Sequence, residues 1–192
     1  IGMAISNPLS GERRAGHIGL PLPGVQVRLC DEKDNIVSNG EAGEIQVYGK
    51  NVFLNYWNLP DATAKAFTHD GWFRTGDVAV LSAGYYKILG RSSVDIIKSG
   101  GYKLSAIEIE EVLRQHEAIS DCSVIGIENE TWGEVVCAAV VLNKNINTNE
   151  IDHWINGLLP KYKTPKRYLV INELPRNAMG KVVKPEVKKL FI

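Results

Sequence analysis

The sequence predicts an α+β fold in two parts, a β-rich, barrel-like segment over residues 1–91 and a small α+β domain over residues 92–192. In the first part, short alternating apolar runs are separated by Gly, Pro and Asn, which is typical of strands joined by turns. In the second part, runs with helical spacing are mixed with valine-rich runs of strand length. The pattern changes within GRSSVD, residues 90–95, and this change places the boundary.

Three strands and one helix are expected in the first part. The strands are VQVRL at 25–29, GEIQVYG at 43–49 and YYKIL at 85–89, each bounded by turn-forming residues. Several short strands with turns between them are typical of a small barrel or sandwich. The helix is expected in PDATAKAF at 60–67, where a proline opens an alanine-rich turn.

The second part is expected to contain three helices. Ser105 and Glu108 have the spacing of a capping box, and apolar residues follow at helical spacing to Leu113. A second helix is expected over 151–159, where apolar residues repeat every three or four positions, and a last one from Pro185. The strands expected around them are DCSVIGI at 121–127, EVVCAAVVL at 134–142 and RYLVI at 167–171.

Composition excludes several classes of function. The 192 residues carry 22 Lys and Arg against 22 Asp and Glu, so no basic surface for nucleic acid is expected. No apolar run approaches the ~18 residues that a membrane-spanning helix needs, so no membrane insertion is expected. The four histidines are scattered and no GxSxG string occurs, which argues against a metal site in this chain and against an esterase-type nucleophile.

The cysteines bear on the compartment. Cys30, Cys122 and Cys137 are odd in number and lack CxxC spacing, so neither a disulfide framework nor a zinc site is expected. A reducing compartment, the cytoplasm, is the simplest interpretation. The chain opens with Ile1 in structured-looking sequence, so we expect a fragment, and an organelle stays open if a targeting segment preceded it.

Four glycine-containing polar strings carry the functional argument: WFRTGD at 72–77, LGR at 89–91, KSGGYK at 98–103 and PRNAMGK at 175–181. Each string alone is more typical of a turn than of a site. Their combination and order, together with GEIQVYGKNVFLNYW at 43–57, resemble the adenylate-forming superfamily of acyl-CoA synthetases, aryl-CoA ligases, luciferases and peptide-synthetase adenylation domains. The resemblance covers essentially the whole chain.

The resemblance implies an ATP-dependent acid–thiol ligase of fatty acid metabolism. In that family a carboxylic acid attacks the α-phosphate of ATP, and the acyl group of the resulting acyl-adenylate then moves to coenzyme A. Lys181 matches the catalytic lysine that bridges the carboxylate and the α-phosphate, where an ammonium can neutralise developing charge. Asp77 matches the aspartate that accepts hydrogen bonds from the ribose hydroxyls, and Arg91 an arginine that reaches the nucleotide.

The resemblance also implies that two half-reactions share one cavity. Residues 1–91 would be the end of a large AMP-binding domain, and residues 92–192 a mobile domain that rotates about a hinge at Ser93 or Val94. Gly100 and Gly101 match the pair beside which the thiol arm of coenzyme A passes, a place where no side chain can intrude. Lys98 and Lys103 flank this pair and are candidates for the phosphates of coenzyme A.

Within the superfamily, SNPLSGERRAGHIGLPLPGV at 6–25 most resembles malonyl-CoA synthetases. Arg13 matches an arginine that meets the second carboxylate of malonate, for which a guanidinium fork is suited. The family's phosphate-binding loop and its magnesium-holding glutamate match nothing in this chain, so ATP and magnesium would be held mostly by an absent amino-terminal domain. We therefore expect the chain alone to be inactive.

Two other functions stay open from the sequence. An adenylation domain that loads a carrier-protein thiol would share all these strings. A non-catalytic homologue that docks on a partner would not need Lys181, Asp77 and Arg91 together, and their presence speaks against it.

Overall fold

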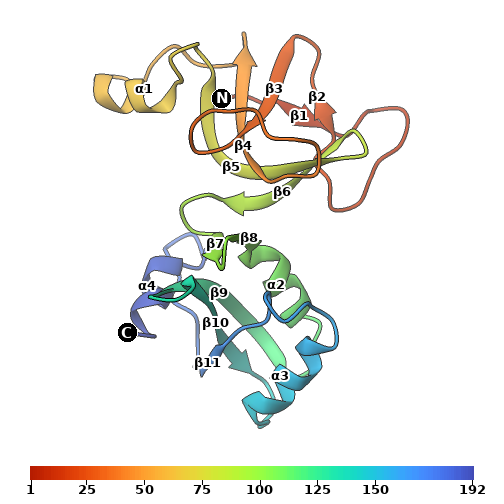
Figure 1. Ribbon diagram of the computed structural model, residues 1–192, viewed down its shortest axis with the longest axis vertical. Coiled ribbons are helices and arrows are strands. Elements are labelled where there is room, and N and C mark those ends of the chain that lie inside the picture. The colour runs from red at the N-terminus through yellow and green to blue at the C-terminus, as the bar shows by residue number, and fades with distance from the viewer. The chain divides into compact units, whose positions relative to one another are not determined.

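The computed structural model describes residues 1–192, which divide into two compact units, Ile1–Ser92 and Ser93–Ile192 (Figure 1). The division lies in the turn between β6 (Tyr85–Arg91) and β7 (Ile96–Ser99). Each unit has its own sheets and its own apolar core, and strands and helices together confirm the α+β class. None of the helices has the length and apolar character that crossing a membrane requires.

The first unit is built on an antiparallel sheet. Its four strands, in spatial order, are β3 (Val25–Cys30), β4 (Gly43–Gly49), β5 (Phe73–Ser82) and β6. The sheet is open, because β3 and β6 are edge strands that do not pair with each other, so the expected barrel-like segment lacks closure. β1 (Ile5–Ser6) and β2 (Leu20–Pro21) form a separate antiparallel pair. Leu29, Ile45, Val47, Ala79 and Tyr86 form the buried core.

The helix expected in this unit is α1 (Pro60–Ala66), which buries none of its residues. Four aromatic rings pack next to it instead of an aliphatic core. The rings of Phe53, Phe67 and Phe73 lie 5.1–5.6 Å apart in edge-on contacts, and Tyr56 adds a contact of 4.7 Å to Phe53. Aromatic pairs favour such tilted geometry because the positive ring edge meets a negative face.

The second unit is organised around one central strand. β10 (Gly133–Leu142) pairs antiparallel with β9 (Ile119–Asn129), parallel with β11 (Arg167–Val170), and at Gly133 with Ser99 of β7. β7 continues into β8 (Tyr102–Ser105). The three helices are α2 (Ala106–Leu113), α3 (Thr148–Asn156) and α4 (Lys184–Lys189).

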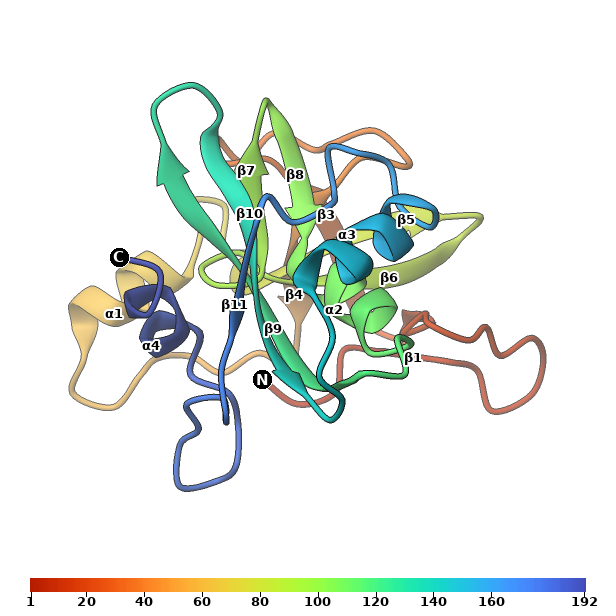
Figure 2. The same ribbon diagram turned by 90° about the horizontal axis from the view of Figure 1, so that it is seen from below.

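Both faces of β10 are covered, as Figure 2 shows, with α2 and α3 on one side and α4 on the other. Val136, Ala138 and Val140 pack with residues of α2 and α3, whereas Cys137 and Ala139 pack with α4. Successive side chains of a strand point to opposite faces, so a strand that is buried on both faces is apolar at successive positions. This burial explains the unbroken apolar run in the sequence.

The helix ends differ in part from expectation. At α2, Ser105 accepts from the Glu108 backbone N–H at 3.1 Å, but the Glu108 carboxylate binds the Lys163 ammonium at 2.7 Å, so only half of the capping box forms. A complete capping box forms at α3 between Asn147 and Glu150. That helix ends at Asn156, before the expected end at residue 159. Gly157 and Leu158 donate to carbonyls three residues back, at 3.1 and 3.0 Å, so the chain continues from the helix as a tighter turn.

The three cysteines are buried and unpaired in disulfides. Burial is the main cause that raises the pKa of each thiol, and it raises the pKa of Cys122 to about 12. A low-dielectric environment disfavours the thiolate, so these groups are protonated at neutral pH.

A network of polar side chains holds the outer face of the first sheet. The Arg28 guanidinium binds the Asp70 carboxylate with two hydrogen bonds of 2.8 and 3.1 Å and lies 4.4 Å from the ring centre of Trp72. Thr68 donates to the same carboxylate at 2.6 Å. Arg28 first, and then Thr68, lower the pKa of Asp70 to about 2.

This pKa predicts how the chain responds to acid. In the unfolded chain Asp70 titrates near its ordinary value of 3.8, whereas in the folded protein it stays ionised to about 2. The contribution of Asp70 to the free energy of unfolding is therefore present above pH ~4 and is lost as the pH falls towards 2. We expect the difference in unfolding free energy between wild type and Asp70→Asn, measured with urea, to shrink over that interval.

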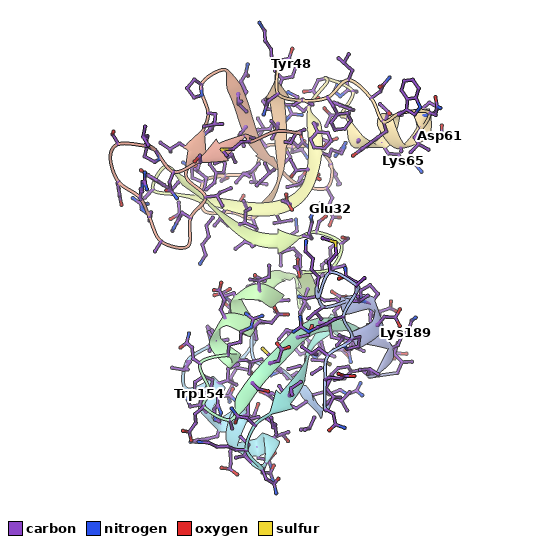
Figure 3. The ribbon with its side chains drawn as sticks, turned by 180° about the vertical axis from the view of Figure 1, so that it is seen from behind. Glu32, Tyr48, Asp61, Lys65, Trp154 and Lys189 are labelled. Atoms are coloured by element: carbon purple, nitrogen blue, oxygen red, sulfur yellow. The ribbon has the colours of Figure 1, made fainter.

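The control is Asp61→Asn, at an exposed acid on α1 that forms no ion pair (Figure 3). It should leave the acid limb of the stability profile unchanged. A wild-type profile that runs parallel to that of Asp70→Asn between pH 5 and 2 would contradict the assignment.

Candidate functional site

The string FRTGD forms a bulge in β5. Ile45 of β4 faces three residues of β5, 75–77, in the register of the two strands. Gly76 has a φ of 75°, in the left-handed region that glycine adopts without strain, and its N–H donates to Glu44 Oε1 at 2.9 Å. The bulge takes Asp77 out of the pairing with β4.

Asp77 and Arg91 are brought together by the pairing of β5 with β6, in which they lie opposite each other. Arg91 Nε lies 2.9 Å from Asp77 Oδ1, and Arg91 Nη1 donates to the Thr75 carbonyl at 3.0 Å. A Cβ at Gly76 would lie 3.1 Å from Nη1, so glycine leaves room for the guanidinium. The pair remains accessible, with 33% of the Asp77 side chain and 58% of the Arg91 side chain exposed.

Lys181 lies on a tight hairpin formed by PRNAMGK. The Asn177 carboxamide oxygen accepts from the backbone N–H groups of Met179 and Lys181, each at 3.0 Å. Gly180 closes the turn with a φ of 78°, and its N–H donates to the Asn177 carbonyl at 2.9 Å. The Lys181 side chain is exposed, and its ammonium forms no ion pair within this unit.

The hairpin is also held by Arg176. Its guanidinium binds the Gly180 carbonyl and the carboxylate of Asp121 on β9. The guanidinium thus fixes the turn to the central sheet while the ammonium of Lys181 stays available. Such a site can stabilise an anion, because a fixed backbone limits where the charge can move.

Gly100 and Gly101 form the two-residue turn between β7 and β8, with φ values of 56° and 84°. Positive φ at both positions is the type I′ geometry that matches the twist of a hairpin. The turn is fixed by the neighbouring segment, because the Gly100 N–H donates to the Trp132 carbonyl at 2.9 Å. A Cβ at Gly100 would lie 3.0 Å from the Trp132 ring, so the ring covers the glycine closely.

Two further side chains shape this region. Asn129 Oδ1 accepts from the N–H groups of Thr131 and Trp132 at 3.0 Å each, which orders the β9–β10 turn. Glu134 Oε2 accepts from the Lys98 N–H at 2.7 Å and so holds β7. The glycine turn is therefore supported on both sides by residues near the start of β10.

A cavity of about 350 Å³ opens beside the glycine turn, lined by Gly100, Trp132, Tyr162, Lys161 and Lys166 among others. Tyr162 stacks on Tyr102 with ring centres 4.8 Å apart and an interplanar angle of 20°. Aromatic faces suit a flat ring that can stack on them, and the ammonium groups nearby suit phosphate oxygens. Lys98 and Lys103 do not line this cavity; they face each other across the hairpin instead.

The segment that carries Tyr162 and the two lysines is anchored at its centre. Lys163 binds both oxygens of Glu108 at 2.7 and 2.8 Å, and the Lys166 N–H donates to the Val136 carbonyl at 2.7 Å. Lys166 Nζ donates to the Lys161 carbonyl at 3.0 Å, whereas Lys161 is exposed. One lysine of the loop is thus structural and its neighbours are available to a ligand.

Arg13 lies in the first unit, in an exposed loop that borders an open cavity of about 760 Å³. Its guanidinium donates only to the neutral carbonyls of Pro8 and Leu9, at 3.3 and 3.2 Å. Arg14 differs, because it binds Glu12 at 3.0 Å and lies 4.4 Å from the ring centre of Tyr85. Of the two adjacent arginines, only Arg13 keeps a charge that no carboxylate meets.

Ser93 is the exposed first residue of the second unit and lies in the turn between β6 and β7. It borders a small cavity of about 150 Å³ together with Val94, Glu134, Lys184 and Lys188. The sequence identified Ser93 by its distance from Arg91 alone; the side chains near it come from β10 and α4, which no local pattern joins to this turn.

The chain matches two family models and is similar to several known proteins. Residues 1–57 match the AMP-binding enzyme model, and residues 108–181 match the model of the AMP-binding enzyme C-terminal domain. A mitochondrial malonate–CoA ligase of Bos taurus is 45% identical over 214 aligned residues, which cover 100% of this chain and 36% of that protein. A malonate–CoA ligase of Arabidopsis thaliana is 45% identical over 97% of this chain and 32% of its own length.

A solved structure is similar as well. MatB from Rhodopseudomonas palustris, crystallised with ATP bound, is 37% identical and superposes with a TM-score of 0.86, covering 98% of this chain and 38% of that one. The chain therefore spans only about a third of the length of the curated relatives it matches.

Proposed function

Because this chain belongs to the AMP-binding enzyme family, we propose that it forms the carboxyl-terminal part of an ATP-dependent acyl-CoA ligase. The proposed enzyme joins a carboxylic acid to the α-phosphate of ATP with release of pyrophosphate, and then transfers the acyl group to coenzyme A with release of AMP. The observation that carries the proposal is the 45% identity to a malonate–CoA ligase over the full chain. The geometry of the matched strings supports it.

Lys181 is proposed to act in the first half-reaction. Its ammonium is exposed and free of carboxylates, on a backbone fixed by Asn177 and Arg176. The attack of a carboxylate on the α-phosphate concentrates negative charge on both groups, and a positioned ammonium lowers the energy of that arrangement.

Asp77 and Arg91 are proposed to hold the nucleotide from the first unit. The carboxylate is an acceptor suited to ribose hydroxyls, and the guanidinium next to it supplies donors for phosphate or hydroxyl oxygens. We assign no magnesium ligand to this chain, because the glutamate that would hold the ion in the family matches none of its residues. Magnesium would accompany ATP on residues outside it.

Coenzyme A is proposed to bind along the glycine turn and in the 350 Å³ cavity. The thin pantetheine arm would pass the turn of Gly100 and Gly101 on its open side, because a Cβ at Gly101 would meet nothing within 4 Å, whereas the Trp132 ring covers Gly100. The adenine ring of coenzyme A would lie against the aromatic rings of Trp132 and Tyr162, and the phosphate groups of coenzyme A would lie near Lys161 and Lys166. Coenzyme A is proposed in preference to a carrier-protein thiol because the relatives named above are CoA ligases.

Malonate is the proposed acid, with Arg13 as the cation for its second carboxylate. Arg13 is the arginine of its loop without a carboxylate partner, and two relatives are named malonate–CoA ligases. Ser93 is proposed as the hinge about which the second unit turns between the two half-reactions, since it is an exposed small residue in the turn where the units divide. The cytoplasm expected from the sequence has an organellar alternative, which the mitochondrial relative supports.

Replacing the lysine should separate the half-reactions. In the full-length protein, Lys181→Ala should lower acid-dependent pyrophosphate exchange by ~100-fold or more, because the charge on the phosphate is no longer neutralised. Transfer from supplied acyl-adenylate to coenzyme A should stay close to wild type. Lys189→Ala, at an exposed lysine of α4, serves as control. Equal loss of both half-reactions would count against the role of Lys181.

The cavity can be tested with a truncated thiol. Lys161→Met should raise KM for coenzyme A by ~5-fold, the effect of one solvent-exposed charge contact. KM for pantetheine, which lacks the nucleotide, should not change. A rise for both thiols would show that Lys161 acts on the glycine turn or the fold instead.

The choice of acid can be tested at Arg13. With malonate, methylmalonate, acetate and a medium-chain acid as substrates, wild type should prefer the diacids. Arg13→Leu should lower kcat/KM for malonate by ~30-fold or more, since a charge-assisted pair is lost, and should change that for acetate little. Arg14→Leu should leave the ratio of kcat/KM for malonate to kcat/KM for acetate unchanged. An unaltered diacid preference in Arg13→Leu would exclude this residue from recognition.

A further inference from the structure

A buried cluster of three charges lies next to the Lys181 hairpin. Lys184 Nζ lies 2.7 Å from Asp95 Oδ1 and 2.9 Å from Glu110 Oε1. The side chains are nearly enclosed, with 13% of Lys184, 13% of Asp95 and 7% of Glu110 exposed. The sequence did not single out any of the three, because they come from α4, the turn before β7, and α2.

Each member of the cluster belongs to an element that is itself fixed. Glu110 Oε1 also accepts from the Val124 N–H at 2.8 Å, which ties the cluster to β9, and Glu110 Oε2 accepts from Arg114 at 3.1 Å. The backbone carbonyl of Asp95 accepts from the N–H of Ala106 at 2.8 Å. The ammonium of Lys184 therefore binds to a rigid frame of strand and helix.

Lys184 is close to Lys181 along the chain. Only two residues separate them, so their Cα atoms are at most ~10 Å apart. The intervening backbone closes the hairpin, because the Val183 N–H donates to the Pro175 carbonyl at 2.9 Å and Val182 bridges to Arg176. The contacts of Lys184 with Asp95 and Glu110 thus set the position of the base of the hairpin. Arg176 holds the hairpin to β9 through Asp121.

Asp95 gives the cluster its connection to the unit boundary. It lies two residues after Ser93, where the second unit begins. The ammonium of Lys184 therefore joins the first residues of the second unit to the Lys181 hairpin, which lies near the end of that unit.

We propose that Lys184 is a positioning residue for Lys181: through Asp95 and Glu110 it fixes the hairpin to the start of the unit, so that the Lys181 ammonium moves with the unit as one rigid part. This inference rests on the proposed function of Lys181. Lys184 itself is buried in an ion cluster and does not act on substrate.

The adenylation half-reaction should be the more sensitive one. The glycine turn is held by hydrogen bonds to Glu134 and Trp132, whereas the Lys181 hairpin is held by Arg176 and by the ion pairs of Lys184. Glu134 also lies 4.0 Å from Lys188 of α4, a longer contact than the 2.7 and 2.9 Å of the Lys184 ion pairs. Loss of the ammonium leaves two carboxylates facing each other in a poorly solvated space, and they will move apart. A displacement of about 1 Å at a reacting group can lower a rate by ~100-fold.

The experiment compares four variants in the full-length protein: Lys184→Met, Lys184→Arg, Asp95→Asn and Lys189→Met. Lys189 is the matched control, because it lies on the same helix and pairs with Glu186 at 2.8 Å, but with 69% of its side chain exposed (Figure 3). Acid-dependent pyrophosphate exchange and acyl transfer from supplied acyl-adenylate to coenzyme A are measured for each, with thermal unfolding by circular dichroism.

We expect Lys184→Met to lower kcat of pyrophosphate exchange ~10- to 100-fold and acyl transfer by no more than ~3-fold. Lys184→Arg should restore much of the exchange, because it returns a cation, and Lys189→Met should match wild type. Asp95→Asn keeps the size of the side chain and the contact of Lys184 with Glu110. Asp95→Asn therefore tests the proposal even if Lys184→Met does not fold. We expect it to lower pyrophosphate exchange more than acyl transfer.

Two results would overturn the inference while leaving the proposed function intact. In one, Lys181→Ala loses exchange but folded Lys184→Met and Asp95→Asn keep it within ~3-fold of wild type. In the other, exchange and transfer fall together in both variants, which would indicate a general structural role. Retention of exchange by Lys181→Ala would overturn the inference together with the role of Lys181.

Discussion

The second unit depends on the burial of β10 on both faces. Its side chains alternate between the core under α2 and α3 and the core under α4, so a shift of one residue would move every side chain to the wrong core. The candidate sites of the second unit are held by this strand and by β9 beside it. Its first residues hold the glycine turn, the Val136 carbonyl holds the loop of Lys166, and β9 beside it carries Asp121, the partner of Arg176. The fixed register of one strand thereby sets the spacing of groups far apart in sequence.

Much of the fold could be predicted because its signals are local. The apolar run expected at 134–142 is β10 nearly to the residue, and the helix expected after Ser105 ends at Leu113 as observed. β5 was not anticipated, since a glycine in FRTGD indicates a turn, whereas the structure accommodates it as a bulge within a long strand. The local sequence pattern also could not predict whether the first sheet closes into a barrel, because closure depends on pairing between its two edge strands.

The candidate site divides along the same line. Asp77, Arg91, Gly100, Gly101 and Lys181 could be predicted as site residues because each lies in one of several short strings that follow a recognisable order. Trp132, Tyr162 and Lys184 were missed because a tryptophan, a tyrosine or a lysine alone carries no functional signal. Their positions follow from pairings between segments, such as the stack of Tyr162 on Tyr102 and the contact of Lys184 with Asp95. The adjacent arginines 13 and 14 show the same limit, since only their contacts tell them apart.

The burial of all three cysteines has a consequence for the proposed reaction. An acyl-adenylate is a mixed anhydride, and a thiolate of the enzyme could intercept it before coenzyme A does. Cys30, Cys122 and Cys137 are each enclosed, and their raised pKa values keep the sulfur protonated and poorly nucleophilic. In the proposed reaction, the three thiols of this chain would therefore compete poorly with coenzyme A for the acyl group.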